Sequence, residues 1–216
     1  MNIIVEGVDG SGKTTIIGEI LKQLDKENYK TFYIKEIEDS PLKFLLERML
    51  SEDPFFKGKE KFSTSIYETF ILAADFFYKQ EYYRNSIKSI NIYDRDFLTI
   101  LCYQKIILQN EYGDKINPFF ENFTRCLLFN LKKIDLLIYI GVPSNISFKR
   151  VETRDEMILS KEEKKFLEDA KKNFEEVLLP SLEVNGINII YIDGEKDLHN
   201  NVLRLVEVIK NEKVKC

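Results

Sequence analysis

Short apolar runs alternate along the chain with longer segments in which apolar residues recur at helical spacing. The runs predict five β-strands, at residues 2–6, 31–35, 90–93, 136–140 and 187–192. The longer segments predict helices at 13–26, 41–50, 62–84, 97–109, 118–132, 143–150, 166–179 and 196–210. Strands that alternate with helices predict an α/β, three-layer fold, in which a five-stranded and mainly parallel sheet has helices on both faces.

Composition and charge narrow the class of protein. The 216 residues suffice for one substantial core and are few for two, so we expect a single domain over 1–216. A net charge of −4 argues against a protein that coats nucleic acid. The longest apolar run, 136–142, is too short to cross a bilayer, and the first residues lack the basic segment of a secretory signal. We therefore expect a soluble, cytoplasmic protein without a nucleic-acid or membrane partner.

The strongest chemical signal is a glycine-rich segment between the first strand and the first helix. Residues 7–14 read Gly-Val-Asp-Gly-Ser-Gly-Lys-Thr and match the phosphate-loop pattern G-x-x-x-x-G-K-[ST] in full. Glycines let the backbone wrap closely around an anion, which the inward N–H groups and the helix N-terminus attract. Lys13 would reach the β- and γ-phosphates of ATP, the Thr14 hydroxyl would ligate Mg²⁺, and Thr15 would contact the α-phosphate.

These features predict a P-loop NTPase fold with ATP and Mg²⁺ as cofactors. The predicted ATP-binding residues are Gly7, Val8, Asp9, Gly10, Ser11, Gly12, Lys13, Thr14 and Thr15. The alternative interpretation is a glycine turn that matches the pattern by chance, and the order of strand, loop and helix argues against it.

The second signal is an Asp-Arg pair directly after the third predicted strand. Ligands of open α/β sheets bind at the carboxyl ends of the strands, which is where Asp94 and Arg95 stand. Asp94 would hold Mg²⁺ directly or through water. Arg95 would clamp an acceptor phosphate or the transferred phosphoryl group, because its planar fork matches phosphate oxygens. The alternative is a surface salt bridge at the end of a strand.

Taken together, these motifs resemble those of the thymidylate kinase family. Residues 6–15 are similar to that family's phosphate loop, and Asp94-Arg95 with Thr99 and 103–104 resembles its DRxxxSxxxYQ segment, with Thr in place of Ser. Residues 137–143 followed by basic residues resemble its fourth strand, proline and basic lid, and 191–194 resemble its last strand and adenine-side loop. The resemblance covers nearly the whole chain.

The resemblance implies roles for individual residues. Asp9 would bind the 3′-hydroxyl of the acceptor sugar, and Arg95 would hold the acceptor phosphate. Gly10 stands where some members carry an arginine; members without it place catalytic arginines in the lid, here at about 143–165, where Arg150 and Arg154 lie. Without the resemblance, the charges of this segment predict only a solvent-exposed helix. The implied catalytic residues are Lys13, Asp94, Arg95, Arg150 and Arg154, with Thr14 and Asp94 at the metal. The acceptor-binding residues are Asp9, Glu36, Leu72, Phe76, Arg95, Thr99, Tyr103 and Gln104.

The departures from the family fall on the acceptor side. Residues 35–41 lack the glycines of the family's Arg-Glu-Pro-Gly-Gly turn. Leu72 stands where a phenylalanine stacks on thymine, Phe76 where an arginine follows it, and Asp96 where a tyrosine is frequent. The use of ATP is therefore better supported than dTMP as the acceptor. Arg48 and Arg84 are candidates for the missing charge, although neither matches the arginine's position.

Three functions remain open. The first is a thymidylate kinase that makes dTDP from dTMP and ATP. The second is a deoxynucleoside kinase, or a kinase of another nucleoside monophosphate; for a nucleoside, Glu36 could take the proton of a 5′-hydroxyl. The third is a non-catalytic ATP-binding switch. The family also implies a homodimer, for which the helix that starts near Phe62 could be the interface or could instead be buried within one subunit.

Overall fold

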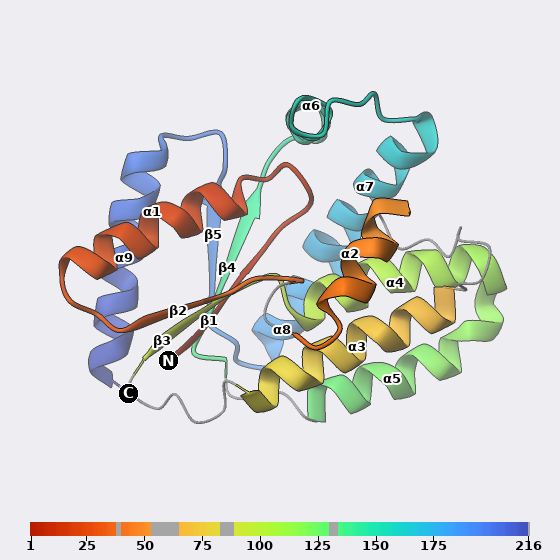
Figure 1. Ribbon diagram of the computed structural model, residues 1–216, viewed down its shortest axis with the longest axis horizontal. Helices are drawn as coiled ribbons and strands as arrows, with labels where there is room; N and C mark the ends of the chain where they lie inside the picture. The colour runs from red at the N-terminus through yellow and green to blue at the C-terminus, as the bar shows by residue number, and fades with distance from the viewer. Residues whose placement is uncertain (38–39, 53–64, 83–88, 130–133, 216) are drawn as a thin grey trace. The chain divides into compact units, whose positions relative to one another are not determined.

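The computed structural model describes residues 1–37, 40–52, 65–82, 89–129 and 134–215 (Figure 1). The chain divides into two compact units. The first unit comprises Met1–Ile34, Ser86–Arg95 and Ile134–Cys216, and the second comprises Lys35–Asn85 and Asp96–Lys133. The prediction of a single domain over 1–216 stays a prediction, and each unit is described by itself.

The first unit holds a five-stranded sheet in which every neighbouring pair of strands is parallel. The strands are β1 (Asn2–Glu6), β2 (Thr31–Ile34), β3 (Ile90–Asp94), β4 (Leu136–Gly141) and β5 (Ile189–Asp193), and their order in space is β2-β3-β1-β4-β5. Strand β4 lies between β1 and β5, and its first five residues are all buried. Its near-continuous apolar run follows from this burial, because a strand covered on both faces needs apolar residues at successive positions. The predicted strands and the α/β fold are confirmed.

Helices cover both faces of this sheet, which gives the three predicted layers (Figure 1). On one face, α1 (Lys13–Lys26) and α9 (Leu198–Lys215) pack on alternate residues of the strands in one continuous apolar core. On the other face, the ring of Tyr139 in β4 lies 5.8 Å from that of Phe174. Phe174 begins a π-helical segment, η3 (Phe174–Leu178), which links α7 (Lys161–Asn173) to α8 (Leu179–Val184).

Two helices of the first unit differ from the sequence-based expectation. Helix α6 (Ser144–Arg154) continues beyond the predicted end at 150, and α7 begins at Lys161, before the predicted 166. The early start has a local cause, because the Ser160 hydroxyl accepts from the N–H of Glu163 while the Glu163 carboxylate accepts from the N–H of Ser160. This reciprocal cap satisfies two N–H groups that a helix start otherwise leaves without partners.

The second unit is helical in its described part. It contains α2 (Lys43–Glu52), α3 (Ser65–Tyr82), α4 (Phe97–Tyr112), the short 3₁₀ segment η2 (Gly113–Ile116) and α5 (Asn117–Phe129). The predicted helices at 62–84 and 118–132 are confirmed over these spans, and their remaining residues, among them Phe62 and Arg84, lie outside the described part. Across the described residues of both units, none of the helices combines the length and the apolar character needed to cross a membrane.

Candidate active site

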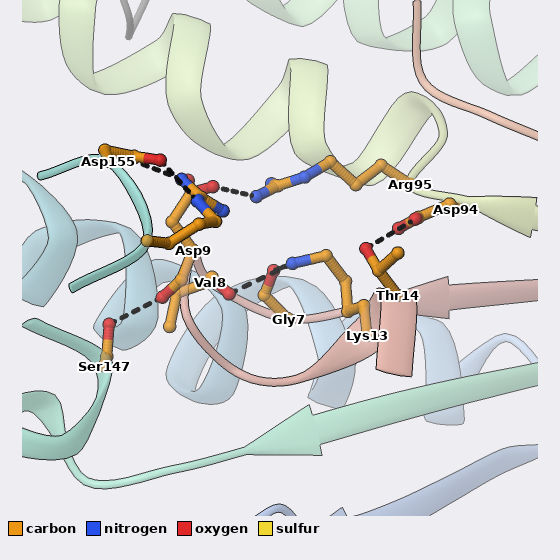
Figure 2. Close-up of polar contacts among 10 residues, drawn as sticks. Gly7, Val8, Asp9, Lys13, Thr14, Asp94, Arg95, Ser147 and Asp155 are labelled. Carbon is orange, nitrogen blue, oxygen red and sulfur yellow. Dashed lines mark hydrogen bonds and ion pairs between the residues drawn. The ribbon is translucent and has the colours of Figure 1, made fainter. Parts of the chain in front are cut away.

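The phosphate loop leads from β1 into α1 with a backbone that only glycine accepts at some positions (Figure 2). Gly10 has φ +75°, and a Cβ added there would lie 2.5 Å from the carbonyl oxygen of Ser147. The Ser147 hydroxyl in turn donates to the Asp9 carbonyl oxygen at 2.6 Å. Helix α6 therefore packs against the loop so closely that a side chain at position 10 has no room.

Lys13 lies within the curve of this loop. Its side-chain nitrogen donates to the carbonyl oxygens of Gly7 at 2.8 Å and Val8 at 3.1 Å, and the residue is 7% exposed. A buried ammonium group needs compensating acceptors, which these carbonyls supply in the structure. Figure 2 shows the lysine reaching back across the loop that the sequence predicts to hold phosphate.

A hydroxyl and a carboxylate meet beside the lysine. The Thr14 hydroxyl donates to Oδ2 of Asp94 at 3.1 Å, because β1 and β3 are neighbours and Val5 stands opposite Asp94. Hard oxygen ligands of this kind fit Mg²⁺, which is usually held by one or two carboxylates together with substrate phosphates and water. Among the residues that the structure describes, no three His, Cys, Asp or Glu side chains are clustered as an all-protein metal cage. The residues present thus fit a Mg²⁺ ion that arrives with ATP.

A third group at this carboxylate was not expected from the sequence. The hydroxyl of Tyr33, in β2, also donates to Oδ2 of Asp94, at 2.8 Å. Tyr33 belongs to no recognised motif, and the contact depends on the order of the strands, which places β2 beside β3.

Arg95 adopts a strained backbone conformation at the end of β3. Its φ is +66°, a value that costs a residue with a side chain roughly 1–3 kcal/mol. Its N–H donates to the Val5 carbonyl oxygen at 3.0 Å, and its guanidinium forms a 2.7 Å ion pair with Asp9 Oδ1. The structure therefore brings together Asp9 and Arg95, the two residues that the resemblance assigned to the acceptor's sugar and phosphate. In this arrangement each neutralises the other's charge.

Helix α6 places both predicted lid arginines near the phosphate loop. Arg150 donates to the carbonyl oxygens of Gly10 at 3.2 Å and Ser11 at 3.4 Å, and to that of Gly194 at 3.1 Å. Arg154 forms two 2.6 Å hydrogen bonds with the Asp155 carboxylate.

The charge of Arg154 is stabilised by its surroundings. The hydrogen bonds to Asp155 are the main reason that the pKa of Arg154 is raised, with Asp9 adding to the effect while burial and Arg95 oppose it. Arg154 therefore stays a cation at every working pH, near enough to Asp9 and Arg95 to interact with their charges.

A groove of about 550 Å³ runs along the edge of the sheet where β5 ends. Its floor and rim carry aromatic, acidic and basic side chains. They belong to Tyr139, Glu175, Tyr191, Asp193, Lys196 and Arg204, and Gly141, Ile192 and Asn201 complete the lining. The groove adjoins the turn at Gly194, which Arg150 contacts, so it lies on the side of the loop that the resemblance assigns to adenine.

In the second unit, the acceptor-side candidates lie mostly in apolar packing. Phe76 is 4% exposed, and its ring lies 5.2 Å from that of Phe77 and 6.3 Å from that of Phe97. Leu72 packs with Leu46 and Met49 of α2. The two residues that replace the family's aromatic and arginine therefore both contact apolar residues of this unit, and their acceptor-binding role stays a prediction.

The polar candidates of α4 are buried as well. Gln104 accepts a 2.7 Å hydrogen bond from the Thr69 hydroxyl, while Thr99 and Tyr103 are less than a tenth exposed. Asp96, which stands at the family's tyrosine position, accepts from the side-chain amide of Gln80 at 3.2 Å.

A buried lysine is the residue of this unit that sequence reasoning missed. The side chain of Lys79, 8% exposed, forms a 2.8 Å ion pair with Asp75 one helical turn earlier. Its nitrogen also donates to the carbonyl oxygens of Lys35, at 2.8 Å, and Glu36. Of the two arginines considered for the missing charge, Arg48 is exposed on α2 and Arg84 lies outside the described residues. The sequence signal for this ion pair was the four-residue separation of Asp75 and Lys79, because oppositely charged residues four apart on a helix are neighbours.

The comparisons with known proteins agree with this geometry. The family model described as thymidylate kinase matches residues 5–204. A probable thymidylate kinase of Pyrococcus horikoshii is 25% identical, over 95% of this chain and 95% of its own length, and one of Thermococcus onnurineus is 27% identical, over 96% and 97%. The solved structure of a deoxyadenosine kinase from M. mycoides superposes with a TM-score of 0.72 at 20% identity, covering 98% of this chain and all of that one, which shows a common fold. Since the family model spans most of a chain that carries the family's phosphate loop and Asp-Arg pair, the chain belongs to the thymidylate kinase family and is a nucleotide kinase.

Proposed function

We propose that this protein transfers the γ-phosphate of ATP to dTMP, forming dTDP and ADP. An oxygen of the dTMP phosphate forms a bond to the γ-phosphorus, and the bond from that phosphorus to the β,γ-bridging oxygen breaks, so that ADP leaves with the bonding electrons. The carrying observation is the joint arrangement of Lys13 and the Thr14–Asp94 pair at one phosphate loop, in a chain of the thymidylate kinase family.

The charged residues beside the phosphate loop each have a role in this proposal. Lys13 would exchange its loop carbonyls for the β- and γ-phosphates, and Arg150 and Arg154 would stabilise the charge that develops at the transferred group. Mg²⁺ held by Thr14 and Asp94 would neutralise charge on the β- and γ-phosphate oxygens. Arg95 would break its ion pair with Asp9 and bind the acceptor phosphate instead. The Asp9 carboxylate could then accept a hydrogen bond from the sugar hydroxyl.

A nucleoside acceptor is the second candidate, and the environment of Glu36 favours it. Lys79 fixes the backbone at Glu36, and its ammonium group contacts the Asp75 carboxylate and two backbone carbonyl oxygens, so binding an acceptor phosphate would require Lys79 to give up one of these contacts. A carboxylate held there suits removal of a proton from a 5′-hydroxyl better than it suits a doubly charged phosphate. Glu36 would then be the general base, and a deoxynucleoside would replace dTMP.

We further propose that the protein works as a cytoplasmic homodimer. Helix α3 carries an exposed aromatic face, on which Tyr67, Phe70 and Tyr82 are 45%, 52% and 64% exposed. Large exposed apolar patches mark interaction sites more often than ordinary surface, and aromatic residues are enriched in interfaces.

A screen of acceptors by coupled ADP release tests the proposal. The full chain is assayed with ATP, Mg²⁺ and one acceptor at a time. The acceptors are dTMP, dUMP, dAMP, thymidine, deoxyadenosine and deoxycytidine. We expect the highest kcat/KM with dTMP. Faster turnover of a nucleoside, abolished by Glu36→Gln, would replace this proposal with the nucleoside kinase. ATP binding without acceptor-dependent ADP release would support the non-catalytic switch.

A further inference from the structure

Among the residues that the structure describes, hydrogen-bond donors reach only one of the two carboxylate oxygens of Asp94. Oδ2 accepts from the Thr14 hydroxyl at 3.1 Å and from the Tyr33 hydroxyl at 2.8 Å. Within the described part of the chain, Oδ1 accepts no hydrogen bond, although the residue as a whole is 8% exposed. Two donors on the same oxygen fix the rotation of the carboxylate and leave the other oxygen available to a ligand.

The strand register explains how Tyr33 reaches this position. Tyr33 in β2 stands opposite Ile92 in β3, and Asp94 is two residues further along β3. Because side chains two apart on a strand point to the same face, Asp94 lies on the face to which Tyr33 and Ile92 also belong. The ring of Tyr33 packs against the core between the sheet and α1, and its length carries the hydroxyl to the carboxylate.

The two hydroxyls have different capacities once a metal ion binds. The Thr14 hydroxyl would offer a lone pair to Mg²⁺, and it has a single hydrogen to donate to Asp94. Its hydrogen bond to Asp94 therefore depends on the position that the hydroxyl takes when the ion and the nucleotide bind. Tyr33 has no part in the phosphate loop, and it is fixed by its own packing in the core. Its hydrogen bond to Asp94 can therefore persist when the loop adjusts to ATP.

We propose that Tyr33 is a positioning residue that orients Asp94 for the divalent cation accompanying ATP. The inference rests on the proposed function for the metal role of Asp94 and goes beyond it by assigning Tyr33. Groups that hydrogen-bond a metal-binding carboxylate set its direction, and their loss typically costs 10- to 100-fold in metal affinity or activity. Tyr33 does not touch the nucleotide in this account, and it acts only through Asp94.

The test compares Tyr33→Phe with Tyr29→Phe in the full chain. Tyr33→Phe keeps the ring in the core and removes only the hydroxyl. Tyr29 packs against the same core cluster just before β2, so it is a matched control for the loss of a partly buried tyrosine hydroxyl. Binding of Mn²⁺ is followed by electron paramagnetic resonance in the presence of a non-hydrolysable β,γ-imido analogue of ATP. Binding of the same analogue without metal is measured by calorimetry, and the Mg²⁺ concentration for half-maximal ADP release gives the parallel kinetic readout.

We expect Tyr33→Phe to weaken Mn²⁺ binding about 10-fold and to raise the required Mg²⁺ concentration in parallel. Metal-free binding of the analogue and all properties of Tyr29→Phe should match the wild type. Wild-type Mn²⁺ affinity in Tyr33→Phe, or an equal loss in Tyr29→Phe, overturns the assignment. A wild-type chain that binds the analogue but no Mn²⁺ overturns it together with the metal role of Asp94. Failure of dTMP as an acceptor while Tyr33→Phe still weakens Mn²⁺ binding overturns the proposed acceptor alone and leaves Tyr33 in place.

Discussion

The two units of the molecule hold their charged side chains in different ways. In the first unit, Lys13 and Arg150 contact loop carbonyls, which a phosphate chain can displace because the same loop is built to bind anions. In the second unit, Lys79 is paired with Asp75 and two backbone carbonyls, and little of the pair reaches solvent. Cations of the first kind are available to a ligand, whereas the cation of the second kind is part of the unit's own structure.

This difference predicts that charge removal acts on stability in the second unit and on catalysis in the first. The largest effect is expected for Lys79→Met, which leaves the buried carboxylate of Asp75 without its cation. Breaking a buried pair from one side costs about 3–5 kcal/mol in the free energy of unfolding, measured by urea denaturation. The double variant Asp75→Asn with Lys79→Met should recover part of that loss.

Lys43→Met is the matched control for this prediction. Lys43 forms an ion pair with Glu47 at the same helical spacing, but both side chains are more than a third exposed. Exposed pairs of this kind contribute about 0.3–0.5 kcal/mol. Equal losses for Lys79→Met and Lys43→Met would remove the contrast between the two units.

Lys13→Ala should have the next largest effect, and it should act on the reaction. Losing a group that stabilises charge in the transition state costs roughly 10²- to 10³-fold in kcat. Rapid-quench measurement of ADP formation gives kcat, and circular dichroism reports whether the fold is kept. Lys22→Ala is the control, because Lys22 is exposed on the same helix and forms its ion pair with the exposed Glu19, one turn away. Full activity in a folded Lys13→Ala protein would contradict the role of the loop.

Arg154→Ala should lower kcat by a smaller factor and leave the affinity for ATP almost unchanged. A charge-assisted hydrogen bond is worth about 1.5–3 kcal/mol, which corresponds to roughly 10- to 100-fold. The raised pKa of Arg154 keeps it charged throughout the working range, so the loss should not vary with pH. Lys149→Ala on the same helix, exposed and basic, should keep wild-type kcat. A raised KM for ATP at unchanged kcat would assign Arg154 to ground-state binding instead.

The smallest effect concerns the connection between α6 and α7. The hydrogen bond from Lys164 is the main reason that the pKa of Glu152 lies below its ordinary value, and the N–H of Leu159 adds to it. A lowered pKa in the folded protein means that this contribution to stability is complete above the unfolded-state pKa and is lost as pH falls through the folded-state pKa. The melting temperature of the wild type should therefore exceed that of Glu152→Gln slightly at pH 7, where the carboxylate is ionised. The gap should close in acid, and a gap that widens in acid would contradict the sign.

The sequence predicted most of what depends on local order along the chain. The five strands and the phosphate loop follow from apolar runs and from a motif whose residues are neighbours in sequence. The start of α7 at Lys161 was missed although its signal is local, since Ser160 and Glu163 have the spacing of a capping box.

Contacts across strands or between distant segments could not be read in the same way. Tyr33 reaches Asp94 because β2 lies beside β3, and no residue pattern in either strand predicts that strand order. Lys79 reaches the backbone of Lys35 and Glu36, a contact that depends on how α3 packs in the second unit. The predicted roles of Leu72 and Phe76 rested on family positions, whereas their burial depends on that same packing.

The central claim is that the γ-phosphate of ATP passes to the phosphate of dTMP. The most direct measurement supplies ATP radiolabelled in its γ-phosphate, offers dTMP and thymidine together, and separates the products by chromatography. This account predicts that the label appears in dTDP, in an amount equal to the ADP formed, and that Lys13→Ala slows its appearance roughly 10²- to 10³-fold while Lys22→Ala does not. Label that appears in dTMP would show transfer to thymidine, and label released only as inorganic phosphate would show hydrolysis; either result would contradict the account.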